Sequence, residues 1–144
     1  LPIQDGIDVM TVGGVTFKRY LEIAQTLNKE TAVVTDNDGN IEAVKKKYKE
    51  YEGIPCIHIC VDEVVDTGDL KLSDKDFNYN TLEPKILKEN GRDVMNKILG
   101  TNYDTDDEMH KYMHAHKTDC AIAIFESAMK IKYPEYIMRA IKNE

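Results

Sequence analysis

Long apolar runs and an N-terminal secretory signal are both missing from this sequence of 144 residues. A membrane-spanning helix needs about 20 consecutive apolar residues, so we expect no membrane partner and a cytoplasmic location. Cysteine is scarce, and three cysteines, an odd number, favour reduced thiols over a disulfide framework. Positive charge is also limited, since 19 lysines and arginines face 26 acidic residues, for a formal net charge of −7. This balance argues against a surface that holds nucleic acid by bulk positive charge alone, and it leaves room for a basic patch.

A P-loop is absent as well, because G-x-x-x-x-G-K-[ST] occurs nowhere in the sequence. This chain therefore cannot by itself hydrolyse a nucleotide through such a loop. Its length and its 42% of hydrophobic residues suit one domain with one core. Because the chain begins with Leu1 rather than methionine, we expect it to be a piece of a longer protein.

Hydrophobic periodicity predicts an α/β fold. Short apolar runs typical of strands alternate with segments of helical spacing, and this order predicts parallel strands. The expected strands span 6–12, 31–35 and 54–61, and the expected helices between them span 17–27 and 41–51. The polar stretch 62–80 predicts a loop with room for a short hairpin. The second half predicts helices at 82–99, 104–114, 118–131 and 134–142.

Two cysteines and a histidine in IPCIHIC raise the question of a metal site. Cys56 and Cys60 flank His58, but they alternate with isoleucines, which favours a buried strand with thiols in the core. His110 and His114 lie four residues apart without the H-E-x-x-H pattern, so exposed or DNA-facing histidines are favoured over a zinc site. An apolar stripe further on is expected to pack in the core: Ala121, Ile122, Phe125, Ala128 and Met129.

Two carboxylates separated by one residue follow the second expected strand, in VVTDNDGN. Asp36 and Asp38 lie where open parallel sheets bind ligands, beyond the carboxyl ends of the strands. Two anions so close repel each other unless water, hydrogen bonds or a cation offsets the charge. A magnesium site explains the pair, because strand-end carboxylates hold hard cations that in turn bind phosphate oxygens.

An acidic pair of this spacing also occurs in calcium loops, in some phosphatases and in simple solvated turns. A calcium loop of the EF-hand type is excluded, since Ile41 and Lys47 stand where it needs glycine and glutamate. A phosphatase of the haloacid dehalogenase type carries Asp-x-Asp at a strand end, but Asn40 stands where that family usually has threonine or valine. A solvated turn in which the two aspartates only cap the next helix stays open.

Five segments in a fixed order carry a resemblance to a known family. They are TVGG followed by an F-x-x-Y helix, AVVTDNDG, TLE, KTDCA and PEYIMRAI. Together they resemble the C-terminal Toprim domain of the OLD (overcoming lysogenization defect) family of ATP-dependent nucleases. The resemblance implies a Rossmann-like α/β domain over residues 1–144, with a short parallel sheet flanked by helices and a helical C-terminal portion. It also implies DNA as a partner and a possible homodimer of the full-length protein. An ATPase domain would precede this chain, and ATP would act only through that domain.

The resemblance further implies a metal-dependent endonuclease with a two-metal mechanism. Asp36, Asp38 and Glu83 would be catalytic metal ligands for two Mg²⁺ or Mn²⁺ ions, and Lys117 would steady the scissile phosphate. A turn beside the site would be formed by Gly13 and Gly14.

The sequence departs from the family at the first motif. The family's first motif, a glutamate near a strand end, has no counterpart before Gly13, where the only acids are Asp5 and Asp8. The alternative is therefore a catalytically incomplete Toprim-like module that binds DNA or a partner.

Overall fold

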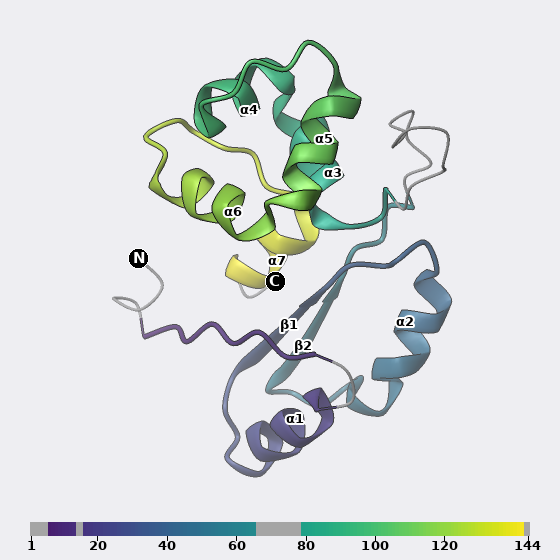
Figure 1. Ribbon diagram of the computed structural model, residues 1–144. Coiled ribbons are helices and arrows are strands. Elements are labelled where there is room, and N and C mark those ends of the chain that lie inside the picture. The colour runs from purple at the N-terminus through teal and green to yellow at the C-terminus, as the bar shows by residue number, and fades with distance from the viewer. Residues whose placement is uncertain (1–5, 14–15, 66–78, 143–144) are drawn as a thin grey trace.

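A computed structural model describes residues 6–13, 16–65 and 79–142. Helices flank a short parallel sheet, and the second half of the chain is helical (Figure 1). This arrangement confirms the expected α/β class. In chain order the elements are α1 (Phe17–Thr26), β1 (Thr31–Thr35), α2 (Ile41–Tyr48), the 3₁₀ helix η2 (Lys49–Tyr51), β2 (Ile57–Val61), α3 (Leu82–Asn90), α4 (Arg92–Leu99), α5 (Asp106–Ala115), α6 (Lys117–Glu126) and α7 (Glu135–Lys142).

The sheet in the described residues consists of β1 and β2, paired in parallel from Thr31 opposite Ile57 to Thr35 opposite Val61. Both strands therefore end at the same edge of the sheet. The strand expected at 6–12 was wrong, because residues 7–13 carry no strand assignment and pair with no described strand. Val9 is 82% exposed, so the run lacks the packing that strand formation depends on. The expected hairpin falls largely on residues outside the described ranges.

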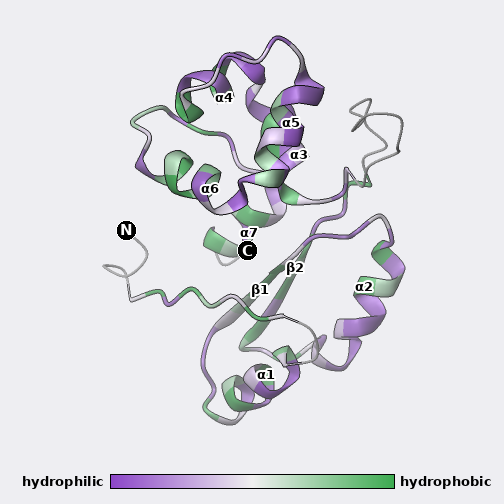
Figure 2. Ribbon diagram, in the orientation of Figure 1, coloured by the Kyte–Doolittle hydropathy of each residue, from purple (hydrophilic) through white to green (hydrophobic). Residues whose placement is uncertain are grey.

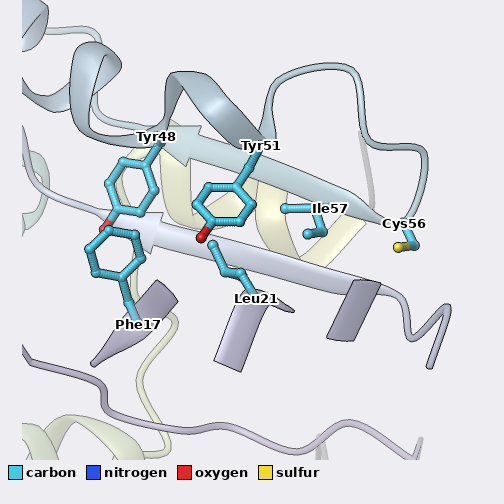
Figure 3. Packing of buried hydrophobic residues seen from close by; sticks show 6 residues of the cluster. All are labelled: Phe17, Leu21, Tyr48, Tyr51, Cys56 and Ile57. Atoms are coloured by element: carbon cyan, nitrogen blue, oxygen red, sulfur yellow. The ribbon is translucent and has the colours of Figure 1, made fainter. Parts of the chain in front are cut away.

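A first hydrophobic core fixes the sheet to α1 and η2. Phe17 of α1 packs its ring against Tyr48, with the ring centroids 4.8 Å apart. Figure 3 shows these two rings in contact, and their planes are tilted by 53°. The buried members of the cluster are Phe17, Leu21, Tyr48, Tyr51, Cys56 and Ile57. Cys56 and Cys60 are buried free thiols, which confirms their expected burial, but only Cys60 lies in β2, because Cys56 belongs to the turn before it.

A second core lies among the C-terminal helices, between α3, α4, α5 and α6. Its buried residues are Ile86, Leu87, Met95, Met109, Met113 and Cys120. The single helix expected over 82–99 is divided at Gly91, whose φ of +81° ends α3 and begins α4. Glycine reaches this backbone conformation without the steric cost that a side chain would add.

The apolar stripe of α6 does not pack in the core as expected. Cys120 is buried, but Ile122 is 51% exposed and Phe125 is 70% exposed. Ala121, Ala128 and Met129 are exposed as well. Hydrophobic residues cover much of this helix (Figure 2), and only one side can face α4 and α5. The helix also ends at Glu126, before the last two residues of the stripe. No helix in the described part of the chain is long and apolar enough to span a bilayer.

The last helix, α7, returns to the sheet. It packs against both β1 and β2, and Figure 1 shows it beside the ends of the two strands. Residues from the end of the sequence are thereby brought next to the acidic segment that follows β1.

Candidate metal and phosphate site

The loop after β1 is held in place by a buried amide. Asn37, fully buried, donates from Nδ2 to the carbonyl oxygens of Asp62 (3.0 Å) and Val64 (2.9 Å). Its Oδ1 accepts a hydrogen bond from the Gly39 amide at 2.8 Å. The acidic loop is thus tied to the segment that follows β2. Sequence reasoning missed this role of Asn37, although an amide between two carboxylates is the available signal.

The same loop turns through a left-handed conformation. Asp38 has a φ of +50° and Gly39 a φ of +83°. The side chain of Asn40 then caps α2 by accepting a hydrogen bond from the Ala43 amide at 3.0 Å. Asn40 therefore caps α2, and the two aspartates are not needed as helix caps.

Replacing Gly39 with alanine is expected to lower the free energy of unfolding by about 1–2 kcal/mol. A side chain is strained at this φ, and its Cβ would lie 3.3 Å from Nδ2 of Asn80. Urea unfolding followed by circular dichroism measures the change. Gly13→Ala is the matched control, since a Cβ at Gly13 meets nothing within 4 Å. Equal stability of the two variants would contradict the strain at Gly39.

Asp36 is half-buried and hydrogen-bonded to the last helix. The hydroxyl of Tyr136 donates to its Oδ1 at 3.0 Å. Burial raises the pKa of Asp36, the hydrogen bond from Tyr136 opposes that rise, and the charges of Asp38, Glu83 and Asp62 add to it. The net pKa is raised, chiefly because burial disfavours the charged carboxylate and secondarily because nearby carboxylates repel it. A divalent cation would relieve this repulsion.

Glu83 and Lys117 form an ion pair across two helices. Glu83 lies in the first turn of α3, and Lys117 is the first residue of α6, with Nζ and Oε1 2.9 Å apart. Burial alone would raise the pKa of Glu83, but Lys117, a backbone amide and the Thr81 side chain together hold it below its usual value. Glu83 is therefore a carboxylate at neutral pH. The side chain of Lys117 is 52% exposed, so its ammonium group is open to solvent.

Asp36, Glu83 and Lys117 come from three segments that are distant in the sequence, and Glu83 interacts with both of the others. Asp36 follows β1, Glu83 is the second residue of α3, and Lys117 is the first residue of α6. The negative charge of Glu83 contributes to the raised pKa of Asp36. Asp38 is exposed beside Asp36. Gly13 is exposed in irregular chain, whereas Gly14 lies outside the described residues.

The donor set suits a hard cation but leaves the coordination incomplete. Across the residues that the structure describes, no group of three or more His, Cys, Asp or Glu side chains is arranged to hold a metal ion. Mg²⁺ is commonly bound through one or two carboxylates, with water and substrate phosphates filling the other positions. Asp36 and Glu83, both hard oxygen donors, fit that kind of site.

The histidines of α5 and the following turn differ from one another. His114 is exposed, as expected, and His116 is exposed as well, but the prediction was wrong for His110, which is fully buried. Burial lowers the pKa of His110. Its side of α5 carries Met109 and Met113 into the second core, which leaves His110 inaccessible to DNA.

A buried ion pair connects the sheet to the helix that carries Glu83. Asp62, directly after β2, bonds to Lys85 of α3, and both side chains are less than a tenth exposed. Asp62 also accepts a hydrogen bond from the Val64 amide at 3.0 Å. The pair joins the end of the sheet to the helix that carries Glu83. Neither residue was singled out from the sequence.

A comparison with protein families gives one match. The family model described as overcoming lysogenization defect protein-like, TOPRIM domain, matches residues 2–38. The match includes Asp36 and Asp38 and ends before Glu83 and Lys117. No curated protein and no solved structure matches the chain significantly. Toprim domains generally bind metal ions and act in nucleic-acid cleavage.

Proposed function

We propose that this chain is the metal-dependent DNA endonuclease part of an ATP-dependent nuclease, because its residues 2–38 match the OLD-like TOPRIM family model. The observation that supports this most is the convergence of Asp36, Glu83 and Lys117 from separate parts of the sequence. Two carboxylates beside one lysine are the charges that a cation and a phosphodiester together require.

The chemistry follows from these charges. Bound Mg²⁺ or Mn²⁺ supplies positive charge to the phosphate oxygens and lowers the pKa of an attacking water. Asp36, Asp38 and Glu83 would hold two such ions through oxygen. Lys117, on an exposed side chain, would leave Glu83 for a phosphate oxygen and stabilise the charge that develops there. Without a bound cation, these carboxylates would repel a phosphate group.

A second candidate function is a Toprim-like module that binds DNA or a partner without cutting. The observation that favours it is that, among the described residues, no three His, Cys, Asp or Glu side chains are arranged to hold a metal ion. In this case the acidic loop would hold a cation that bridges to a phosphate, and no bond would break.

The test is nicking of supercoiled plasmid by the 144-residue chain with Mn²⁺, beside direct Mn²⁺ titration. We expect nicking that EDTA abolishes, because the cation carries the activated water. We also expect Mn²⁺ binding to weaken strongly in Asp36→Asn. Plasmid binding without nicking, with Mn²⁺ binding retained in the wild type, would favour the second candidate. No saturable Mn²⁺ binding would contradict the proposed metal site.

A further inference from the structure

Tyr136 makes a buried polar contact that the proposed chemistry has not yet used. Its side chain is 3% exposed, and its hydroxyl donates to Oδ1 of Asp36, a residue 100 positions earlier in the sequence. A buried tyrosine hydroxyl usually finds a hydrogen-bond partner. Here the partner is the first carboxylate of the acidic loop rather than a backbone carbonyl.

The helix that carries Tyr136 is fixed at a second point. Arg139, three residues later, donates from Nη2 to the carbonyl oxygen of Val61 at 2.6 Å. Residues three apart lie on the same side of a helix. The same side of α7 therefore contacts the residue that follows β1 and the last residue of β2. This double contact determines where the Tyr136 hydroxyl lies, because the ring itself has only two rotatable side-chain bonds.

The hydrogen bond has a defined effect on the Asp36 carboxylate. An ionised carboxylate offers about four lone-pair positions on two oxygens. The phenol occupies one position on Oδ1 and restrains the plane of the carboxylate, which leaves Oδ2 for another partner. The same bond favours the ionised form of Asp36 and so opposes the effect of burial on its pKa. Burial and nearby carboxylates raise the pKa of Tyr136, so its proton stays on the hydroxyl.

We propose that Tyr136 is a positioning residue that orients the Asp36 carboxylate for binding a divalent cation. The inference rests on the proposed function, because it assumes that Asp36 is a metal ligand. Side chains that orient metal ligands through hydrogen bonds typically change metal affinity by about 10- to 100-fold when they are replaced. Tyr136→Phe keeps the buried ring and removes only the hydroxyl.

The experiment measures Mn²⁺ affinity by electron paramagnetic resonance of the free ion, on the 144-residue chain. The proteins are the wild type, Tyr136→Phe, Asp36→Asn and the control Tyr133→Phe, which alters a nearby ring that is 39% exposed. We expect Tyr136→Phe to bind Mn²⁺ about 10-fold or more weakly and Tyr133→Phe to match the wild type. A merely structural role would lower the melting temperature of the metal-free chain without changing its Mn²⁺ affinity.

A second measurement needs no substitution. In the wild-type chain with ¹³C-labelled tyrosine, Mg²⁺ should shift the ring signals of Tyr136 at the concentration at which it binds, while those of Tyr133 stay in place. Unchanged Tyr136 signals on Mg²⁺ binding overturn the positioning role, as does wild-type Mn²⁺ affinity in a folded Tyr136→Phe.

The two proposals fail in different ways. If Asp36→Asn loses Mn²⁺ and Tyr136→Phe retains it, only the role of Tyr136 is lost. If Asp36→Asn binds Mn²⁺ as the wild type does, the proposed metal site is wrong, and the role of Tyr136 falls with it.

Discussion

Replacing Lys117 with methionine is expected to lower the rate of plasmid nicking by about 100- to 1,000-fold, the loss usual for one group that stabilises developing charge. The affinity for Mn²⁺ should not fall, because Lys117 carries a positive charge and competes with a cation for Glu83. The measurement pairs single-turnover nicking with Mn²⁺ titration. A selective loss of rate would separate Lys117 from the residues that bind metal.

Two further variants make this result specific. Glu83→Gln should weaken both nicking and Mn²⁺ binding, since it removes a carboxylate. Lys111→Met, at an exposed lysine of α5, is the matched control and should behave as the wild type. Nicking at the wild-type rate in Lys117→Met would refute the assignment of Lys117 to the phosphate.

Replacing Lys85 with methionine is expected to lower the free energy of unfolding by about 3–5 kcal/mol, the usual cost of removing one partner from a buried ion pair. The cost arises because Asp62, 4% exposed, would keep its charge without the lysine that offsets it. Urea unfolding of the metal-free chain measures the change. Lys97→Met, at an exposed lysine of α4, is the control and should change stability by less than about 0.5 kcal/mol.

The same ion pair allows a test by double substitution. Asp62→Asn combined with Lys85→Met removes both charges, while the asparagine oxygen can still accept the hydrogen bond from the Val64 amide. We expect the double variant to be more stable than Lys85→Met alone, because no unpaired charge stays buried. The explanation would be contradicted if the loss of stability in the double variant equalled the sum of the losses in Asp62→Asn alone and Lys85→Met alone.

The sequence predicted those helices and strands whose apolar residues recur at the spacing typical of a helix or a strand. α1, β1 and α2 lie within a few residues of the expected ranges, and β2 begins at Ile57 rather than at residue 54. The apolar run at 6–12 has the composition of a strand, but composition does not supply a neighbouring strand. The exposed side of α6 was missed for a related reason, since an apolar helix shows no preferred face in its sequence.

Some residues of the candidate site could likewise be identified from a local sequence pattern, and others could not. Asp36 and Asp38 could be predicted because both lie in one short segment after a strand. The resemblance, rather than any local pattern, pointed to Glu83 and Lys117. The contact between Tyr136 and Asp36 had no local signal, because it depends on how α7 packs against the sheet.

The order of the elements along the chain has a consequence for biosynthesis. Both strands and the acidic loop leave the ribosome long before α7, which spans Glu135–Lys142. Until that helix docks, Asp36 lacks the hydroxyl donated by Tyr136. β1 and β2 can thus pair while the proposed metal site is still incomplete, and the Asp36 carboxylate gains its contact with Tyr136 only once α7 has been synthesised and docked.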